Sequence, residues 1–150
     1  SRIYLSETPV KDVAQFFKVL ADEARLQLLW LLLNHRELCV CDLMEALGIT
    51  QSKASRHLAT LRHAGLVSDR KDGTWSYYSM RMTESDLERA QLELLRNQLA
   101  KHAGATRSLQ ALHQWLERKN RAAACVADAA CCTTTVKPGR VRARMAGDKR

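Results

Sequence analysis

The stretch that organises the chain is residues 48–80, GITQSKASRHLATLRHAGLVSDRKDGTWSYYSM. Gly48 suits the left-handed position that ends a helix, here a short one predicted over residues 38–47. A second helix is predicted over residues 51–64, and it ends before Gly65. Its inward face carries three apolar residues, Ala54, Leu58 and Leu61. Two helices joined by a three-residue turn with glycine indicate a helix-turn-helix motif.

A hairpin is predicted directly after this motif. Residues 66–71 and 74–80 are rich in β-branched and aromatic side chains, which favour strands. Asp72-Gly73 joins them, and this pair is typical of tight hairpin turns. A hairpin in this place corresponds to the wing of a winged helix-turn-helix.

Apolar residues at three- and four-residue steps predict helices on both sides of this unit. One follows Pro9 and another is capped by Asp22, with almost no polar face up to Leu33. The stripe expected on the first of them comprises Val10, Val13, Ala14, Phe17, Leu20 and Ala21. A helix that opens at residues 83–86 and a last helix over 107–124 follow the hairpin, interrupted near residues 102–104. The fold class is therefore mainly α with a small β-hairpin.

The chain length of 150 residues is typical of one domain that carries one site. The formal net charge is +8, and most of the surplus lies in residues 133–150, which have no apolar period and are predicted to be a disordered basic tail. We expect a winged helix-turn-helix DNA-binding domain over 1–104, and a C-terminal helix and cysteine segment over 105–132.

Composition and patterning exclude several classes of protein. The 46% hydrophobic content is too high for a disordered or collagen-like chain. The longest apolar run, residues 26–33, is far shorter than the roughly 20 residues that span a bilayer. The N-terminal residues lack an apolar signal core. We therefore expect a cytoplasmic protein with no membrane partner.

Polar side chains on the second helix of the motif point to DNA. They are donors and acceptors suited to base edges and phosphates in a major groove: Gln51, Ser52, Lys53, Ser55, Arg56 and His57. Arg70, Lys71 and Thr74 of the hairpin can reach the neighbouring backbone or minor groove. A basic helix face is by itself often only solvated, but the order of cap, turn, helix and wing favours double-stranded operator DNA.

A homodimer is expected because one module of this size reads only a few base pairs. Two copies on a pseudo-palindromic site, with half-sites about one helical turn apart, would supply the specificity. We expect the first and last helices to form the dimer contact.

Five cysteines lie in two places, and their odd number argues against a plain disulfide framework. Cys39 and Cys41 begin the third predicted helix, where a regular helix would put the two thiols about 200° apart. An ion shared by them would then have to unwind that turn or hold it in a non-helical form. The turn belongs to the helix that supports the second helix of the motif, which we call the reading helix. The alternative is that both are small buried hydrophobic residues. The others are Cys125, Cys131 and Cys132, which could complete a three-sulfur site or be exposed thiols that oxidise.

Three segments of the chain together form a specific pattern. They are Glu37-Leu38-Cys39-Val40-Cys41-Asp42-Leu43, then Ser52-x-x-Ser55-Arg56-His57-Leu58, and then the Gly73–Tyr78 hairpin. Over residues 9–100 the chain resembles the ArsR/SmtB family of winged-helix metalloregulatory repressors, most closely its arsenic-responsive members. The resemblance implies a homodimer that represses an arsenic-resistance operon and leaves its operator when As(III) or Sb(III) binds. It also implies that Cys39 and Cys41 are ligands, and that Gln51 to His57 read DNA.

The sequence departs from that family pattern at the third thiolate, where Met44 stands and is expected to be core. A third sulfur would then come from a C-terminal cysteine, which we favour, or from a solvent thiol, or the ion would stay two-coordinate. The positions of the family's zinc ligands hold Met82, Glu84, Leu95 and Gln98, so that zinc site is not expected. His102 and His113 are interpreted as surface or packing residues.

Other functions are possible for a chain with these thiols. Cadmium- or lead-sensing relatives add cysteines before the Cys-Val-Cys, and this sequence has none there. A redox switch would use Cys131 and Cys132. A thiol enzyme such as an arsenate reductase is disfavoured, because the six residues after Cys39 and after Cys125 supply no arginine or glycine-rich cradle, and no Cys-x-x-Cys is present. We expect no enzyme activity and no catalytic cofactor.

Overall fold

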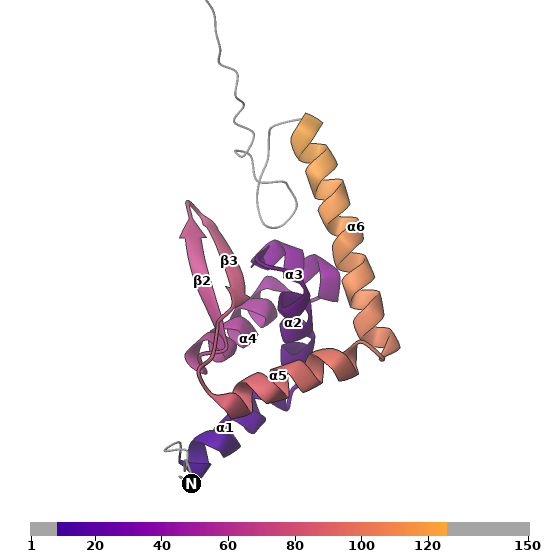
Figure 1. Ribbon diagram of the computed structural model, residues 1–150. Coiled ribbons are helices and arrows are strands. Elements are labelled where there is room, and N and C mark those ends of the chain that lie inside the picture. The colour runs from indigo at the N-terminus through magenta and orange to yellow at the C-terminus, as the bar shows by residue number, and fades with distance from the viewer. Residues whose placement is uncertain (1–8, 126–150) are drawn as a thin grey trace, which may run out of the picture.

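The computed structural model describes residues 9–125, with side chains over 9–123. This part of the chain is mainly helical with one small antiparallel sheet (Figure 1), as predicted. In chain order the elements are α1 (Val10–Leu20), α2 (Glu23–Asn34), β1 (Leu38–Cys39), α3 (Val40–Leu47), α4 (Gln51–His63), β2 (Val67–Asp72), β3 (Trp75–Met80), α5 (Asp86–Leu99) and α6 (Ala103–Cys125). Across the described residues, no helix is both long and apolar enough to span a membrane.

The core is built around α2, which begins where the sequence predicts. The Asp22 carboxylate accepts a hydrogen bond from the Arg25 backbone N–H at 3.1 Å and caps the helix. Residues 28–32 are buried because α2 packs against all five other helices of the described chain and against β3. An almost uniformly apolar helix is therefore the centre of the fold.

The buried face of α1 differs from the predicted stripe. Phe16, Val19 and Leu20 are buried, whereas Val10 is 85% exposed and Phe17 is 44% exposed. The C-terminal end of α1 contacts α2, and the first turns of α1 extend away from the body of the chain (Figure 1). Apolar side chains thus remain on the surface of α1, where periodicity alone suggested a core.

The helix-turn-helix forms as predicted. Gly48 has φ +66° and closes α3, and its N–H donates to the Met44 carbonyl at 2.8 Å. Thr50 caps α4 by accepting from the Lys53 N–H at 3.2 Å. The inward residues Ala54, Leu58 and Leu61 have no exposed surface. These contacts fix α4 against the core and leave its outer face open.

The start of the third predicted helix was wrong by two residues. Leu38 and Cys39 form the short strand β1, and the helix begins at Val40. Strand β1 pairs antiparallel with β3, opposing Leu38 to Tyr78 and Cys39 to Tyr77, so that the sheet order is β1-β3-β2. The partner strand lies almost forty residues further along the chain, so the local apolar pattern did not reveal it.

The wing is the β2–β3 hairpin. Asp72 opposes Trp75, so its loop consists of Gly73 and Thr74, one residue later than predicted. Gly73 has φ +68°, which glycine adopts without strain. At the base of the hairpin Leu66 and Val67 are buried in the core. The wing is thereby joined to the body beside α4.

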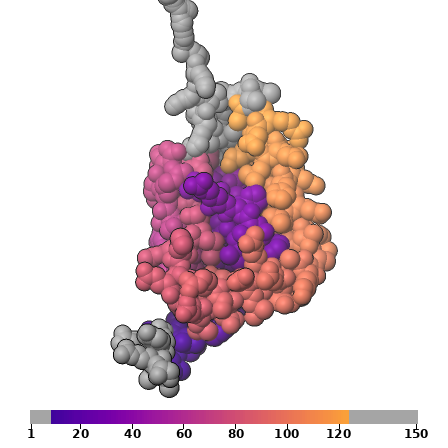
Figure 2. Space-filling model, in the orientation of Figure 1, coloured from indigo at the N-terminus to yellow at the C-terminus, as the bar shows by residue number. Residues whose placement is uncertain are grey.

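Helix α6 begins at Ala103, four residues before the predicted start, and packs against α3 and α2. Leu112 is fully buried, and the Trp30 indole N–H donates to the Ala105 carbonyl at 2.8 Å. The segment with α3 lies between the wing and α6 (Figure 2). The last helix therefore buries its apolar side within its own chain, and the predicted boundary at residue 104 falls inside one continuous core.

We predict that Gly48→Ala lowers the free energy of unfolding by about 1 kcal/mol, because an L-residue in the left-handed region is strained. The matched control is Gly104→Ala in α6. A Cβ would meet no atom within 4 Å at either position, but Gly104 has no positive φ. Alanine there should leave stability unchanged or raise it. Urea unfolding measures both, and equal stabilities for the two variants would contradict the role of Gly48.

Candidate functional site

The outer face of α4 presents five of the six predicted reading residues to solvent. They are Gln51, Ser52, Lys53, Ser55 and Arg56. All five lie in the N-terminal half of the helix, where amide, hydroxyl and cationic groups can reach base edges and phosphates. The buried opposite face of α4 holds this row of donors in a fixed orientation.

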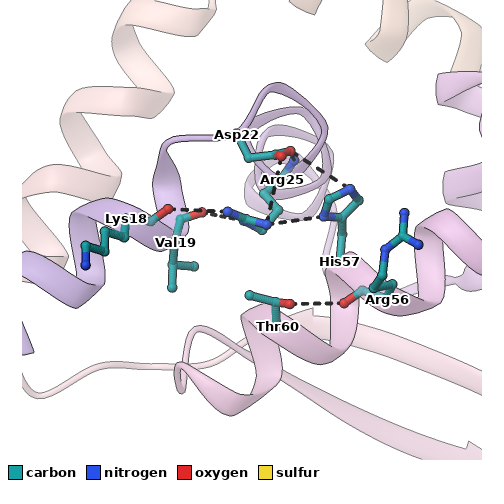
Figure 3. Close-up of polar contacts among 7 residues, drawn as sticks. All are labelled: Lys18, Val19, Asp22, Arg25, Arg56, His57 and Thr60. Carbon is teal, nitrogen blue, oxygen red and sulfur yellow. Dashed lines mark hydrogen bonds and ion pairs between the residues drawn. The ribbon is translucent and has the colours of Figure 1, made fainter.

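His57 is placed differently from the prediction. It is buried, with its ring turned toward α2 (Figure 3). Its Nδ1 lies 3.4 Å from Arg25 Nη1, and its Nε2 lies 4.0 Å from Asp22 Oδ1. The sequence spacing already indicated that His57 would be buried, because position 57 lies three residues after buried Ala54 and four residues before buried Leu61. His57 is thus a packing residue of the reading helix.

Arg25 connects His57 to the end of α1, a contact that the sequence did not suggest. Its Nε donates to the Val19 carbonyl at 2.6 Å, and its Nη2 donates to the Lys18 carbonyl at 3.3 Å. These carbonyls belong to the last turn of α1, where a cation is favourable. Since a guanidinium can only donate, His57 Nδ1 is the acceptor, and the ring is the neutral Nε2–H tautomer.

The pKa of His57 is lowered, mainly because burial disfavours the charged ring. The positive charges of Arg25, Arg56 and Lys53 lower it further, while Asp22 opposes them. The Asp22 carboxyl also has a lowered pKa, chiefly through the hydrogen bond from the Arg25 backbone. At neutral pH the cluster therefore combines a neutral histidine with an ionised carboxylate.

This cluster predicts a pH dependence of stability. Because the pKa of His57 is lower in the folded state, the unfolded chain takes up the proton first as pH falls below about 6.5. The free energy of unfolding should then fall as the pH decreases through about 6.5 and below, and less steeply in His57→Gln. His35 has a lowered pKa as well, so the difference between parent and variant is the quantity to measure. His63→Gln, on the exposed side of α4, is the control and should retain the parent slope.

All three predicted wing residues, Arg70, Lys71 and Thr74, are exposed on the hairpin. Arg70 also makes contacts within the chain. Its Nη2 and Nε donate to the Glu37 carboxylate at 2.7 and 3.0 Å, and its guanidinium lies 4.7 Å from the centre of the Tyr77 ring. Arg70 thus ties the wing to the segment that leads into Cys39.

The two thiols of the Cys-Val-Cys are already together. Cys39 Sγ and Cys41 Sγ are 3.0 Å apart, and both residues are buried and free of a disulfide. Cys39 is the N-cap of α3 with extended backbone, φ −79° and ψ 156°. The expectation that the two thiols diverge was therefore wrong, because it assumed a regular helix at Cys39. The alternative of a first turn held in a non-helical form agrees with the extended backbone of Cys39. Trp75 and Tyr77 of β3 pack over the pair.

The hydrogen bond between the two thiols shifts their pKa values in opposite directions. The hydrogen bond from the Cys41 thiol is the main reason why the pKa of Cys39 falls to about 7, although burial opposes it. The same bond and burial raise the pKa of Cys41. Cys39 is therefore the thiol of the pair that more readily becomes a thiolate, and thiolate is the form that binds soft ions.

Asp42 joins this pair to α6. Its Oδ2 accepts from the Cys39 backbone N–H at 2.8 Å, while its Oδ1 accepts from Trp115 Nε1 and Lys119 Nζ, each at 2.8 Å. Asp42 is 3% exposed. Burial alone would lower the pKa of Lys119, but the charge and hydrogen bond of Asp42 raise it. The ammonium group is thus held protonated beside the thiols.

The remaining predicted sulfur ligands are not placed by the structure. Cys131 and Cys132 lie outside the described residues, and so does the side chain of Cys125. Met44 packs against the core, as predicted. Over residues 9–123, no group of three or more His, Cys, Asp or Glu side chains is arranged to hold a metal ion. In this part of the chain, the thiol site consists of two sulfurs.

Comparison with known proteins identifies the family. Residues 22–69 match the model described as "Bacterial regulatory protein, arsR family". The arsenic resistance transcriptional regulator ArsR2 of Pseudomonas putida is 37% identical over 121 residues, covering 77% of this chain and 94% of that protein. The chain belongs to the arsR family of bacterial regulators. The structure of HlyU from Vibrio cholerae, another winged-helix chain, aligns with a TM-score of 0.55 and 36% identity over 63% of this chain and 99% of that one.

A second relative within the family matches over a shorter region. The arsenical resistance operon repressor of Escherichia coli is 56% identical over 66 residues, 44% of this chain and 56% of that protein. This chain thus spans little more than half the length of the first curated relatives that it matches. The shared family and the wing confirm a winged helix-turn-helix transcriptional regulator.

Proposed function

We propose that this regulator is a homodimeric repressor of an arsenic-resistance operon, and that it leaves its operator when trivalent arsenic or antimony binds Cys39 and Cys41. The observation that carries the proposal is the buried pair of thiols, 3.0 Å apart at the N-terminus of α3. That helix packs directly against the reading helix α4. The names of the arsenic-responsive relatives support the choice of ligand.

Operator DNA would be bound by α4 in the major groove and by the wing beside it. The exposed row from Gln51 to Arg56 supplies donors for base edges and phosphates, and Lys71 and Thr74 supply contacts from the hairpin. His57 is not needed as a reader in this arrangement. It acts from inside, by holding α4 against Arg25.

Lys53→Ala should weaken binding to any duplex and lower the salt slope of binding by about one, because one phosphate contact is lost. Lys101→Ala is the control, since Lys101 is also exposed but lies in the connection between α5 and α6. Fluorescence anisotropy across a range of salt concentrations, with a duplex selected from a random library by the parent protein, measures both variants. Equal slopes for the parent and Lys53→Ala would argue against α4 as the binding surface.

A homodimer would place two reading helices on one pseudo-palindromic site. The exposed apolar side chains of α1, Val10 and Phe17, support the predicted contact through the first helix, and Leu94 of α5 is 49% exposed. In this proposal the last helix supports its own chain and does not form the dimer contact, because α6 packs on α3 and α2.

Arsenite is chemically suited to the thiol pair. Arsenous acid can form two As–S bonds with Cys39 and Cys41, releasing two water molecules and keeping one hydroxyl group. The lowered pKa of Cys39 supplies the attacking thiolate. A third sulfur from Cys125, Cys131 or Cys132 could replace the hydroxyl, and we retain a C-terminal cysteine as the proposed third ligand.

Binding would act by widening the pair. Two sulfurs on one soft ion lie roughly 3.5–4 Å apart, given bonds near 2.3 Å, whereas these thiols are 3.0 Å apart. Cys39 is paired with Tyr77 of the wing strand β3, and Cys41 belongs to the helix that packs on α4. Separating the two sulfurs therefore displaces the wing relative to the reading helix, and a small shift there breaks simultaneous contact with the DNA.

Titration of arsenite into the protein–duplex complex tests this function. The parent should be released, whereas Cys39→Ser and Cys41→Ser should bind the duplex as before and stay bound. Cys125→Ser and the double variant Cys131→Ser/Cys132→Ser are the matched controls for the other thiols. Loss of response in one of them would identify the third sulfur, and full response in both would make the site two-coordinate.

The proposal fails if arsenite leaves the parent complex intact, or if it releases the Cys39→Ser and Cys41→Ser variants as readily as the parent. Release by cadmium or lead but not by arsenite would identify a different metal sensor. Release by peroxide alone would indicate a redox switch.

A further inference from the structure

Two histidines distant in sequence meet on the surface. His35 follows the last residue of α2, and His113 lies in the middle of α6. Their Nε2 atoms are 3.1 Å apart, and the rings are inclined at 65° with centroids 5.1 Å apart. The contact is open to solvent. Within the described residues, neither ring forms a hydrogen bond with the sulfur atoms of Cys39 and Cys41.

The separation of the two nitrogens is that of neighbouring ligands on one metal ion. With metal–nitrogen bonds of about 2.0–2.1 Å, two cis imidazoles have nitrogens roughly 2.9–3.4 Å apart for angles between square and tetrahedral. In the structure one Nε2 carries a proton and donates it to the other. A metal ion can replace that hydrogen bond if the half-buried His35 ring and the exposed His113 ring both turn, so that their lone pairs converge on a point beside the line between the two nitrogens.

The neutral form of the His35 ring, which offers a lone pair to a metal ion, is favoured. Burial and the neighbouring His113 lower the pKa of His35, and the charge of Asp42 only partly opposes this. Neutral imidazole is a common ligand of zinc, nickel and copper and suits these borderline ions better than it suits magnesium or calcium. Asp42 is not a candidate third ligand, because both of its oxygens already accept hydrogen bonds from Cys39, Trp115 and Lys119.

We propose that His35 and His113 form a second metal site, separate from the thiol pair, that binds a divalent transition-metal ion such as Zn²⁺ through both Nε2 atoms, with water as the remaining ligands. The bound ion would cross-link the end of α2 to α6. Helix α6 also holds Asp42 through Trp115 and Lys119, so the cross-link would stabilise the helix that supports the first turn of α3. The site does not depend on DNA binding or on arsenic.

Zinc titration of the full chain, followed by NMR of the histidine ring nitrogens, tests the site directly. The sequence contains five histidines. The Nε2 signals of His35 and His113 should shift together and saturate with one equivalent of Zn²⁺, before those of the exposed His63 and His102 move. Zinc should also raise Tm, because an ion that binds only the folded state stabilises it.

The variants separate this site from the thiols. His35→Gln and His113→Gln should lose the NMR response and the zinc-dependent rise in Tm, whereas His102→Gln and the double variant Cys39→Ser/Cys41→Ser should retain both. Circular dichroism without zinc checks that each variant is folded. The site is refuted if zinc perturbs all exposed histidines alike, or if the rise in Tm survives in His113→Gln, or if it vanishes in the cysteine double variant while the histidine signals do not shift.

Discussion

The buried carboxylate of Asp42 is the interaction on which the arrangement of the site depends. It accepts from the Cys39 backbone, from the Trp115 indole and from the Lys119 ammonium. A carboxylate this deeply buried is stable only when such donors surround it, and removal of one partner of a buried ion pair costs about 3–5 kcal/mol. The first contact caps α3 with Cys39 in an extended conformation, which brings the two thiols together. The other two attach α6 to the same turn.

The sheet that carries the wing and the helix-turn-helix are thereby both connected to the pair of sulfurs at Cys39 and Cys41. Cys39 is continuous with the sheet through its pairing with Tyr77, and Arg70 reinforces that connection by binding Glu37 and stacking over Tyr77. Cys41 is continuous with α3 and the reading helix. In the proposed response, an ion that moves the two sulfurs from 3.0 Å to roughly 3.5–4 Å apart would act at the junction of the wing and the helix-turn-helix.

The sequence predicted those features that depend on neighbours in the chain. The cap at Asp22, the left-handed Gly48 and the buried face of α4 follow from local patterns, and the structure has all of them. It could not reveal β1, because the strand conformation of Cys39 depends on a partner almost forty residues away. The contacts of Trp115 and Lys119 with Asp42 are equally distant. His57 is a different case, since its spacing from Ala54 and Leu61 predicted burial and only its chemical type suggested DNA.

The proposed release from DNA requires that the thiol pair and the DNA-binding surface be energetically coupled. Linkage requires the coupling to be reciprocal, so that DNA must weaken arsenite binding by the same factor by which arsenite weakens DNA binding. Calorimetric titration of arsenite into the free protein and into the protein saturated with its duplex measures this directly. We expect the arsenite affinity to be weaker in the complex by that factor. Equal affinities in the two titrations would contradict it, because the sulfurs would then be independent of the reading helix.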